Sequence, residues 1–203
     1  MTRYLLACLL ALPSSVWAQA RKSGDTPSAP VTAKETWVID TSRSKVGFDL
    51  RLFAGRSDGE FQSWAGTISM PPGKWEDAAV DVVIQAASVH TDEEDRDKHL
   101  RTADFFDVAK YPVITFKSTK ITRDGDSVAI AGNLTIKNVT KPVVLKGKYV
   151  GGTSGPTPEM KFQASVIVNR MDYGVNYESI LVRDGIVLGE DVTIAIALTA
   201  VRR

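Results

Sequence analysis

The chain of 203 residues is poor in the side chains on which most catalytic sites depend. It has one cysteine, at position 8, and two histidines, at positions 90 and 99. No serine stands in a G-x-S-x-G motif, so the common forms of nucleophilic catalysis lack a nucleophile with a base beside it. We therefore expect no enzymatic activity, and no motif indicates a bound cofactor.

Basic residues are not in excess. Lys and Arg total 25, Asp and Glu total 24, and no run of basic residues is longer than two. A protein that binds nucleic acid needs a clustered basic surface to neutralise phosphates. We therefore expect no nucleic-acid partner.

Apolar runs long enough to cross a bilayer as a helix, which takes about 20 residues, are absent from the sequence. The N-terminus has Arg3, a short apolar stretch and small residues up to Ala20, a pattern typical of a secretory signal peptide. We predict a signal peptide over 1–20 with cleavage after Ala20, a flexible polar leader over 21–34 and one domain over 35–203. Cleavage would remove the only cysteine, so the domain would fold without disulfides. Lipidation of Cys8 stays open as an alternative.

From position 36 onward, apolar and polar residues alternate with a period of two, which predicts strands with one buried face. The alternation is clear near residues 46–52, 80–84, 114–116, 128–136, 143–149, 162–168 and 192–198. Turn sequences separate these runs at 71–74, 123–126, 151–158 and 183–185. About eight antiparallel strands at this spacing predict an all-β barrel or sandwich.

One stretch interrupts the alternation. Thr91 to Glu94 has the T-x-x-E pattern of a capping box, in which the threonine side chain accepts from a backbone amide and the glutamate reaches back. We predict a helix over about 92–106, closed by Phe105 and Phe106. These two rings would anchor the helix over one barrel end, or one of them would plug a cavity.

The same stretch holds both histidines among many carboxylates, which raises the alternative of a metal-dependent hydrolase that uses His90 and His99. Their separation of nine residues differs from the i, i+4 arrangement of common zinc motifs. Asp95 and His99 do have i, i+4 spacing, which favours pairing on the helix surface. We therefore predict a structural helix and no metal site.

The volume of the inward side chains decides whether such a barrel is solid or hollow. Small residues share the alternating faces with large apolar ones, at Ala65, Ala86, Gly132, Gly147 and Ala164. Almost no charge lies on these faces, so a ligand inside would be long and apolar, held by burial of its area. Periodicity alone leaves a solid core and a cavity equally open.

Several short motifs, weak one by one, are strong in their order and spacing. They are Trp37–Asp40 (WVID), Arg96–Arg101 (RDKHLR), Ala103–Asp107 (ADFFD), Lys110–Pro112 (KYP) with ITFKST after it, Gly132–Ile136 (GNLTI), Val139–Pro142 (VTKP) and Asn169–Gly174 (NRMDYG). On these motifs the chain, over about 36–201, resembles the YceI family of bacterial periplasmic polyisoprenoid-binding proteins.

The resemblance implies an eight-stranded antiparallel lipocalin-like barrel, with one short helix inserted at about 92–106 and an apolar tunnel. It implies a periplasmic binding or carrier protein for a polyisoprenoid, an isoprenoid quinone or a similar lipid. We predict that the lipid chain contacts inward apolar residues, namely Phe48, Leu50, Phe116, Leu134, Leu145, Phe162, Val166 and Ile194. The resemblance also leaves open a cytochrome b561-type membrane partner, a homodimer, and the alternative of a ligand-free interaction module for that partner.

One position departs from the family pattern. Members commonly have a histidine in D-x-x-H-S after the first strand, whereas this chain has Arg43 in the segment Asp40–Ser44. A fixed cation there would suit a pyrophosphate head group better than a neutral quinone. We predict a polar head group near a barrel end, within reach of donors at Arg43, Arg96, His99, Arg170 or Asn176.

Overall fold

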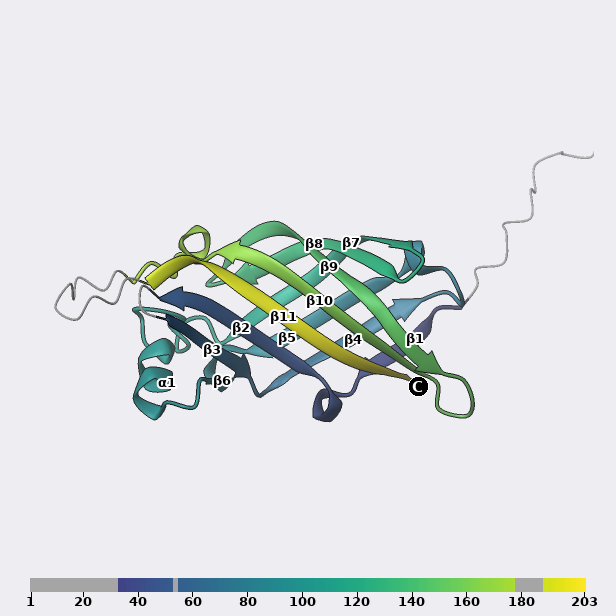
Figure 1. Cartoon of the computed structure of the whole chain (residues 1–203), viewed down its shortest axis with the longest axis horizontal. Coiled ribbons are helices and arrows are strands. Elements are labelled where there is room, and N and C mark those ends of the chain that lie inside the picture. The colour runs from purple at the N-terminus through teal and green to yellow at the C-terminus, as the bar shows by residue number, and fades with distance from the viewer. Residues whose placement is uncertain (1–32, 53–54, 178–187) are drawn as a thin grey trace, which may run out of the picture. The chain divides into compact units, whose positions relative to one another are not determined.

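The computed structural model describes residues 33–52, 55–177 and 188–203 (Figure 1). The predicted signal peptide, nearly all of the leader and the predicted turn at 183–185 lie outside the described residues, so these stay predictions. Among the described residues, no helix combines the length and the apolar composition that crossing a membrane requires.

The described part of the chain is almost entirely β-structure. Its strands are β1 (Glu35–Ile39), β2 (Lys45–Leu52), β3 (Gly55–Phe61), β4 (Trp64–Met70), β5 (Ala79–Gln85), β6 (Val89–His90), β7 (Val113–Asp124), β8 (Ser127–Ile136), β9 (Val139–Thr153), β10 (Glu159–Asn169) and β11 (Leu188–Arg202). The helices are α1 (Glu94–Arg101) and the short 3-10 helices η1 (Thr41–Arg43), η2 (Trp75–Asp77), η3 (Ala86–Ser88) and η4 (Arg170–Tyr173).

Eight strand positions close into a barrel. β1, β4, β5, β7, β8, β9, β10 and β11 pair in this order, each antiparallel to the next, and β11 pairs back onto β1. The all-β, eight-stranded antiparallel barrel with one short helix is therefore confirmed. Turn chemistry supports the order of the strands: Lys137 and Asn138, between β8 and β9, both have positive φ, as a two-residue hairpin turn of type I′ requires.

Three of the eight strand positions are interrupted. β1 and β2 both pair with β11 and are separated by η1, while β4 pairs with β1 and β3 pairs with β2. In the same way β5 pairs with β4 and the short β6 pairs with β3. The barrel thus has continuous strands on one side and a broken wall on the other.

Helix α1 lies at one end of the barrel, beside β3 and β6 (Figure 1). The guanidinium of Arg101 ties it to the wall, because its Nε donates to the carbonyl of Ala87 at 2.7 Å and its Nη2 to the carbonyl of Val89 at 2.8 Å. We call this end of the barrel the α1 end.

The predicted start of the helix is wrong in detail. Helix α1 begins at Glu94, its N-cap is Glu93, and no side chain caps it. The Thr91 hydroxyl instead donates to the buried carboxylate of Asp97 at 2.6 Å, and Arg96 Nε donates to the same hydroxyl at 2.8 Å. The helix also ends at Arg101 rather than at 106, and turns continue to Lys110.

Asp97 is the buried acid that joins α1 to the end of β6. Burial raises its pKa, but hydrogen bonds from Thr91 and His90 outweigh this effect, and the pKa lies below its usual value. We expect Asp97→Asn to lower the free energy of unfolding by about 2 kcal/mol at neutral pH, since hydrogen bonds to a charged group contribute about 1.5–3 kcal/mol.

The pH dependence of this effect has a definite sign. A carboxyl whose pKa is lowered by folding stabilises the fold above its unfolded pKa of about 3.9, and this contribution disappears as the pH falls through the folded pKa. Urea unfolding should therefore separate Asp97→Asn from the parent at pH 7 and much less at pH 2. Asp95→Asn, on the exposed face of α1, is the control and should stay close to the parent at both pH values. An equal difference for Asp97→Asn at both pH values would contradict this role of the carboxylate.

The structure agrees with only some of the predictions that small residues face the interior. Ala65 is exposed and points outward, because Trp64, Gly66 and Ile68 take the inward positions of β4; that prediction is wrong. Gly132 is buried, but a Cβ atom there would lie 2.5 Å from the ring of Phe116, so this ring already occupies the space. Ala164 does face the interior.

Candidate functional site

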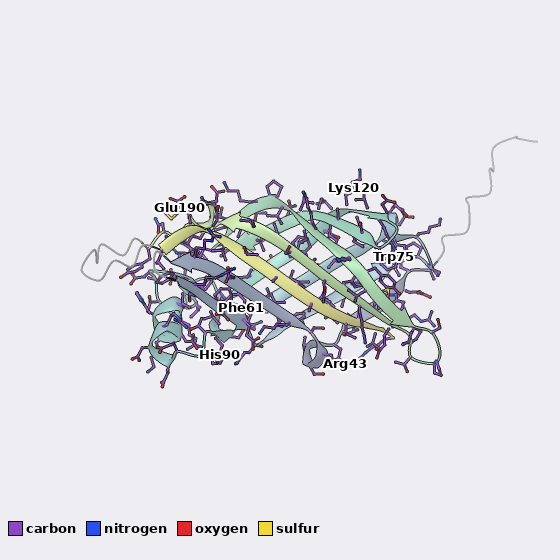
Figure 2. All side chains as sticks on the ribbon, viewed as in Figure 1. Arg43, Phe61, Trp75, His90, Lys120 and Glu190 are labelled. Atoms are coloured by element: carbon purple, nitrogen blue, oxygen red, sulfur yellow. The ribbon has the colours of Figure 1, made fainter. Side chains whose placement is uncertain are left out.

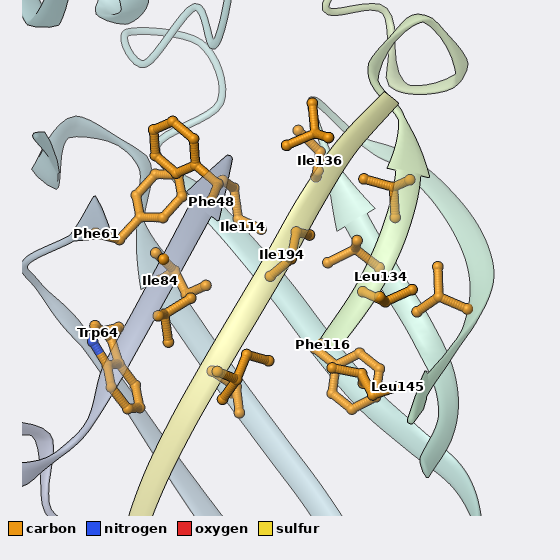
Figure 3. Close-up of a pocket in the computed structure, with 18 of the residues that line it drawn as sticks. Phe48, Phe61, Trp64, Ile84, Ile114, Phe116, Leu134, Ile136, Leu145 and Ile194 are labelled. Atoms are coloured by element: carbon orange, nitrogen blue, oxygen red, sulfur yellow. The ribbon is translucent and has the colours of Figure 1, made fainter. Parts of the chain in front are cut away.

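The interior of the barrel contains a cavity of about 550 Å³ (Figure 3). This volume lies within the range of about 300–1,000 Å³ that is typical of small-molecule sites. Every one of the eight predicted lining residues borders it: Phe48, Leu50, Phe116, Leu134, Leu145, Phe162, Val166 and Ile194. Contact of these residues with a ligand stays a prediction.

The end opposite α1 is packed with aromatic rings. Trp75 from η2 lies edge-on to Phe162 at a centroid distance of 5.7 Å and to Tyr149 at 5.9 Å. The guanidinium of Arg123 lies over both Trp75 and Tyr149, at 4.6 and 4.7 Å from the ring centroids. We call Trp75, Tyr149 and Phe162 the floor cluster, because it closes this end of the cavity.

A second group of rings borders the cavity at the α1 end. The imidazole of His99 lies edge-on to Phe105 at 5.0 Å and to Tyr177 at 4.9 Å, and all three residues line the cavity. His99 Nε2 also lies 2.8 Å from a carboxylate oxygen of Asp104. His99 therefore borders the cavity and also contacts a neighbouring carboxylate, so its ring is oriented by aromatic packing and by the hydrogen bond with Asp104.

The ionisable nitrogen groups of the described lining are two arginines and one histidine. Arg96, His99 and Arg170 border the cavity, and no Asp or Glu side chain does so among the described residues. Arg170 is buried, and it donates to the carbonyls of Gly189 at 2.9 Å and Val175 at 2.6 Å. These bonds fix its guanidinium and hold the chain around η4 at the α1 end.

Tyr173 is almost fully buried beside these basic groups and also lines the cavity. Burial raises the pKa of Tyr173 to about 12, with a smaller contribution from Asp172. Its phenol therefore stays neutral at physiological pH. The polar part of the lining thus combines fixed positive charge with a neutral hydroxyl group.

Two of the predicted head-group residues do not border the cavity. Arg43 lies on η1, outside the barrel wall (Figure 2), and 46% of its side chain is exposed. Its Nε donates to Asp40 at 2.7 Å and its Nη1 to Glu159 at 2.8 Å, so these carboxylates turn it away from the interior. Asn176 is exposed and does not line the cavity either.

The structure does not bring His90 and His99 to a shared carboxylate. His90 lies between Asp97, at 3.0 Å from Nδ1, and Asp92, at 2.9 Å from Nε2, whereas His99 pairs with Asp104. Within the described ranges, no group of three or more His, Cys, Asp or Glu side chains is arranged to hold a metal ion. The alternative of a metal-dependent hydrolase therefore finds no ligand set there.

A comparison with family profiles gives one decisive match. The YceI-like domain matches residues 37–200, which is nearly all of the barrel. The chain belongs to the YceI-like family. The resemblance that the motifs indicated is thereby confirmed.

Curated YceI-like relatives agree with this assignment. The chain is 44% identical over 98 residues to protein YceI of Escherichia coli O157:H7, a match that covers 48% of this chain and 51% of the relative. It is 36% identical over 150 residues to a UPF0312 protein of Pectobacterium atrosepticum, covering 71% and 73%. The chain thus spans about half the length of the YceI proteins that it matches and about three quarters of the second relative.

Solved structures share the YceI-like barrel. Burkholderia cenocepacia BcnA superposes with a TM-score of 0.70 at 22% identity, covering 79% of this chain and 98% of BcnA. The YCEI protein of Campylobacter jejuni gives 0.63 at 28%, covering 71% and 84%. A Saccharophagus degradans domain described as polyisoprenoid-binding gives 0.62 at 17%, covering 82% and 98%. At 22% and 17% identity, the likeness shows the fold alone.

Sequence reasoning missed several aromatic residues of the lining, above all Phe61, Trp64 and Trp75. Phe61 and Trp64 are three positions apart, so in one unbroken strand they would point to opposite faces. The bend between β3 and β4 lets both point inward. The signal was present in the sequence as an odd spacing of apolar residues across the polar pair Gln62–Ser63.

Proposed function

We propose that this YceI-like protein binds the chain of a polyisoprenoid or a similar long lipid inside the barrel and carries it in the periplasm, without a catalytic step. The apolar cavity is the observation that carries the proposal. Its lining is apolar over nearly its whole extent, so affinity would come from the apolar area that the ligand buries. The description of the Saccharophagus degradans domain as polyisoprenoid-binding is consistent with this choice.

The length of the lining favours a long chain. Leu188 and Leu198 of β11 both border the cavity, and ten residues of strand rise about 33 Å, or about 25 Å along the axis of a barrel whose strands tilt by about 40°. One leaflet of a bilayer has a hydrocarbon depth of about 15 Å, half of the full core. A lipid tail of that depth would leave much of the lining empty, whereas a polyisoprenoid chain would reach along it.

The distribution of charge favours a head group that accepts hydrogen bonds at the α1 end. Arg96 and Arg170 border that part of the cavity, and their guanidinium groups are permanently charged hydrogen-bond donors. A phosphate or a carbonyl oxygen would be attracted there, and an ammonium group would be repelled. A cytochrome b561-type partner stays a prediction from the family resemblance.

Mass spectrometry of an organic extract tests the proposal directly. The full chain, expressed with its own N-terminus, would be purified from the periplasmic fraction without detergent. We expect one long-chain isoprenoid-type lipid in about equimolar amount. Protein that carries no lipid, and that also fails to bind a fluorescent prenyl probe, would overturn lipid binding; protein retained in the cytoplasm would overturn the location alone.

A further inference from the structure

The barrel wall has a seam where two interrupted strand positions lie side by side. The ladder between β1 and β4 ends at the pair Val38–Thr67, and the ladder between β2 and β3 begins at Gly47–Glu60. Between these two pairs, the segment that joins β1 to β2 advances nine residues, from 38 to 47. The segment that joins β3 to β4 advances seven, from 60 to 67. Because the two sides differ in length, they cannot continue one ladder, and the residues between these pairs are not paired with each other in the sheet.

Backbone hydrogen bonds hold each side of the seam to its other neighbour. On one side, the amide of Asp40 donates to the carbonyl of Thr199 in β11 at 2.8 Å. On the other side, the amide of Gln62 donates to the carbonyl of Ser88 in η3 at 3.1 Å. Each of these hydrogen bonds joins a segment to its neighbour on the side away from the seam. The two segments are therefore held in place independently of each other.

Side chains close the seam. A polar surface pocket lies over it, lined by Thr41, Ser44, Lys45, Glu60, Phe61, Gln62 and Trp64. Phe61 and Trp64, which Figure 3 shows at one side of the main cavity, line both this cavity and the surface pocket, so the two rings lie between the pocket and the interior. On the outside, Lys45 Nζ lies 2.7 Å from Glu60 Oε2 in an exposed ion pair, a kind of contact that adds little stability.

We propose that this seam is a lateral portal through which the apolar chain of the ligand enters and leaves the barrel. Phe61 and Trp64 form the gate, and the Lys45–Glu60 ion pair holds it from outside. The proposal rests on the proposed function, since it requires a ligand in the cavity, but it concerns the route and not the occupancy.

Three features favour this route. Turning the gate rings breaks no ladder hydrogen bond across the seam, because Phe61 and Trp64 pair only with their neighbours away from it, Val89 in β6 and Ile84 in β5. Passage through the floor would have to displace Arg123 as well as aromatic rings, because its guanidinium lies over both Trp75 and Tyr149. The polar pocket outside the gate also offers hydrogen-bonding groups to the polar end of an amphiphile that follows its chain or precedes it.

Exchange kinetics test the portal independently of occupancy. The full chain would be loaded with a dansyl-labelled geranylgeranyl amine and mixed with phosphatidylcholine vesicles, and the rates of release and uptake would be followed by fluorescence. We expect Trp64→Ala to raise both rates about tenfold, because removal of a gate lowers a barrier in both directions, whereas loss of a ligand contact at this lining residue would raise the release rate alone. Trp75→Ala, which removes the same ring from the floor cluster, should change Kd without raising both rates.

A crosslink gives the opposite perturbation. In a Cys8→Ser background, Lys45→Cys with Glu60→Cys joined by a short bismaleimide should slow exchange about tenfold relative to the same variant before crosslinking. Unchanged rates in both the crosslinked protein and Trp64→Ala would overturn the portal, and normal equilibrium binding in that case would leave the proposed function intact. A parent protein that does not bind the probe would overturn both.

Discussion

Ala164→Phe is expected to weaken lipid binding on the order of a hundredfold while the barrel stays folded. Ala164 lies on β10 between the inward residues Phe162 and Val166, and it borders the cavity. A phenyl ring added there would project into space that the ligand chain needs. Displacing about 100 Å² of ligand contact would cost about 2.5 kcal/mol at 25 cal/mol per Å², close to two orders of magnitude in Kd. Displacement of a fluorescent prenyl probe measures the change.

Ser165→Phe is the matched control for this prediction. Ser165 is the next residue of β10, it is exposed, and its side chain points away from the cavity, so the same ring is added outside the barrel. It should leave Kd unchanged. Both variants should keep the circular dichroism and urea unfolding of the parent. If a folded Ala164→Phe protein binds the probe with the parent's affinity, the ligand does not occupy the mapped cavity.

The continuous strands of the barrel could be predicted from the sequence because each keeps one phase of alternation. On β10, Phe162, Ala164 and Val166 all border the cavity, as the period of two requires. The resemblance to the YceI family supplied what periodicity could not, namely a hollow interior instead of a packed one. For these strands, the alternation of apolar residues and the barrel implied by the YceI resemblance therefore lead to the same prediction.

The broken wall could not be predicted in the same way. Ile39 and Val46 are seven positions apart and both are buried, so the phase of alternation changes across η1. Phe61 and Trp64 show the same change across the next bend. A phase change looks like the end of one strand and the start of another, and only the pairing of β1 and β2 with the same β11 shows that one barrel position is interrupted.

Long polar side chains were the least predictable part of the site, because their positions depend on partners far away in the sequence. Arg43 was a candidate for the head group, yet Glu159 binds it outside the barrel. The Thr91 hydroxyl was expected to cap the helix by accepting from a backbone amide, yet it accepts from Arg96 Nε and donates to the buried carboxylate of Asp97, six residues further on. A guanidinium competes well with a backbone amide as the donor to a hydroxyl oxygen, and sequence spacing alone does not show which of the two donors is near.

The interior of this barrel also depends on a close approach of two strands, which leads to the second large effect. Gly147 on β9 is paired with Ala164 on β10. A Cβ atom at Gly147 would lie 2.1 Å from the carbonyl oxygen of Gln163 and 2.7 Å from the Cα of Ala164. These are backbone atoms of a paired strand, so no rotamer change can relieve the contact.

We therefore expect Gly147→Ala to destabilise the protein by about 3 kcal/mol, the upper part of the range for overpacking, because β9 and β10 must move apart. Gly47→Ala is the control: a Cβ there would meet its nearest neighbour, the carbonyl oxygen of Gly59, at 3.4 Å, an ordinary contact. It should change the free energy of unfolding by less than about 1 kcal/mol, since the added methyl group makes only ordinary contacts. Urea unfolding of the two variants measures the contrast, and equal stabilities would show that β9 and β10 do not approach as closely as the register of Gly147 and Ala164 requires.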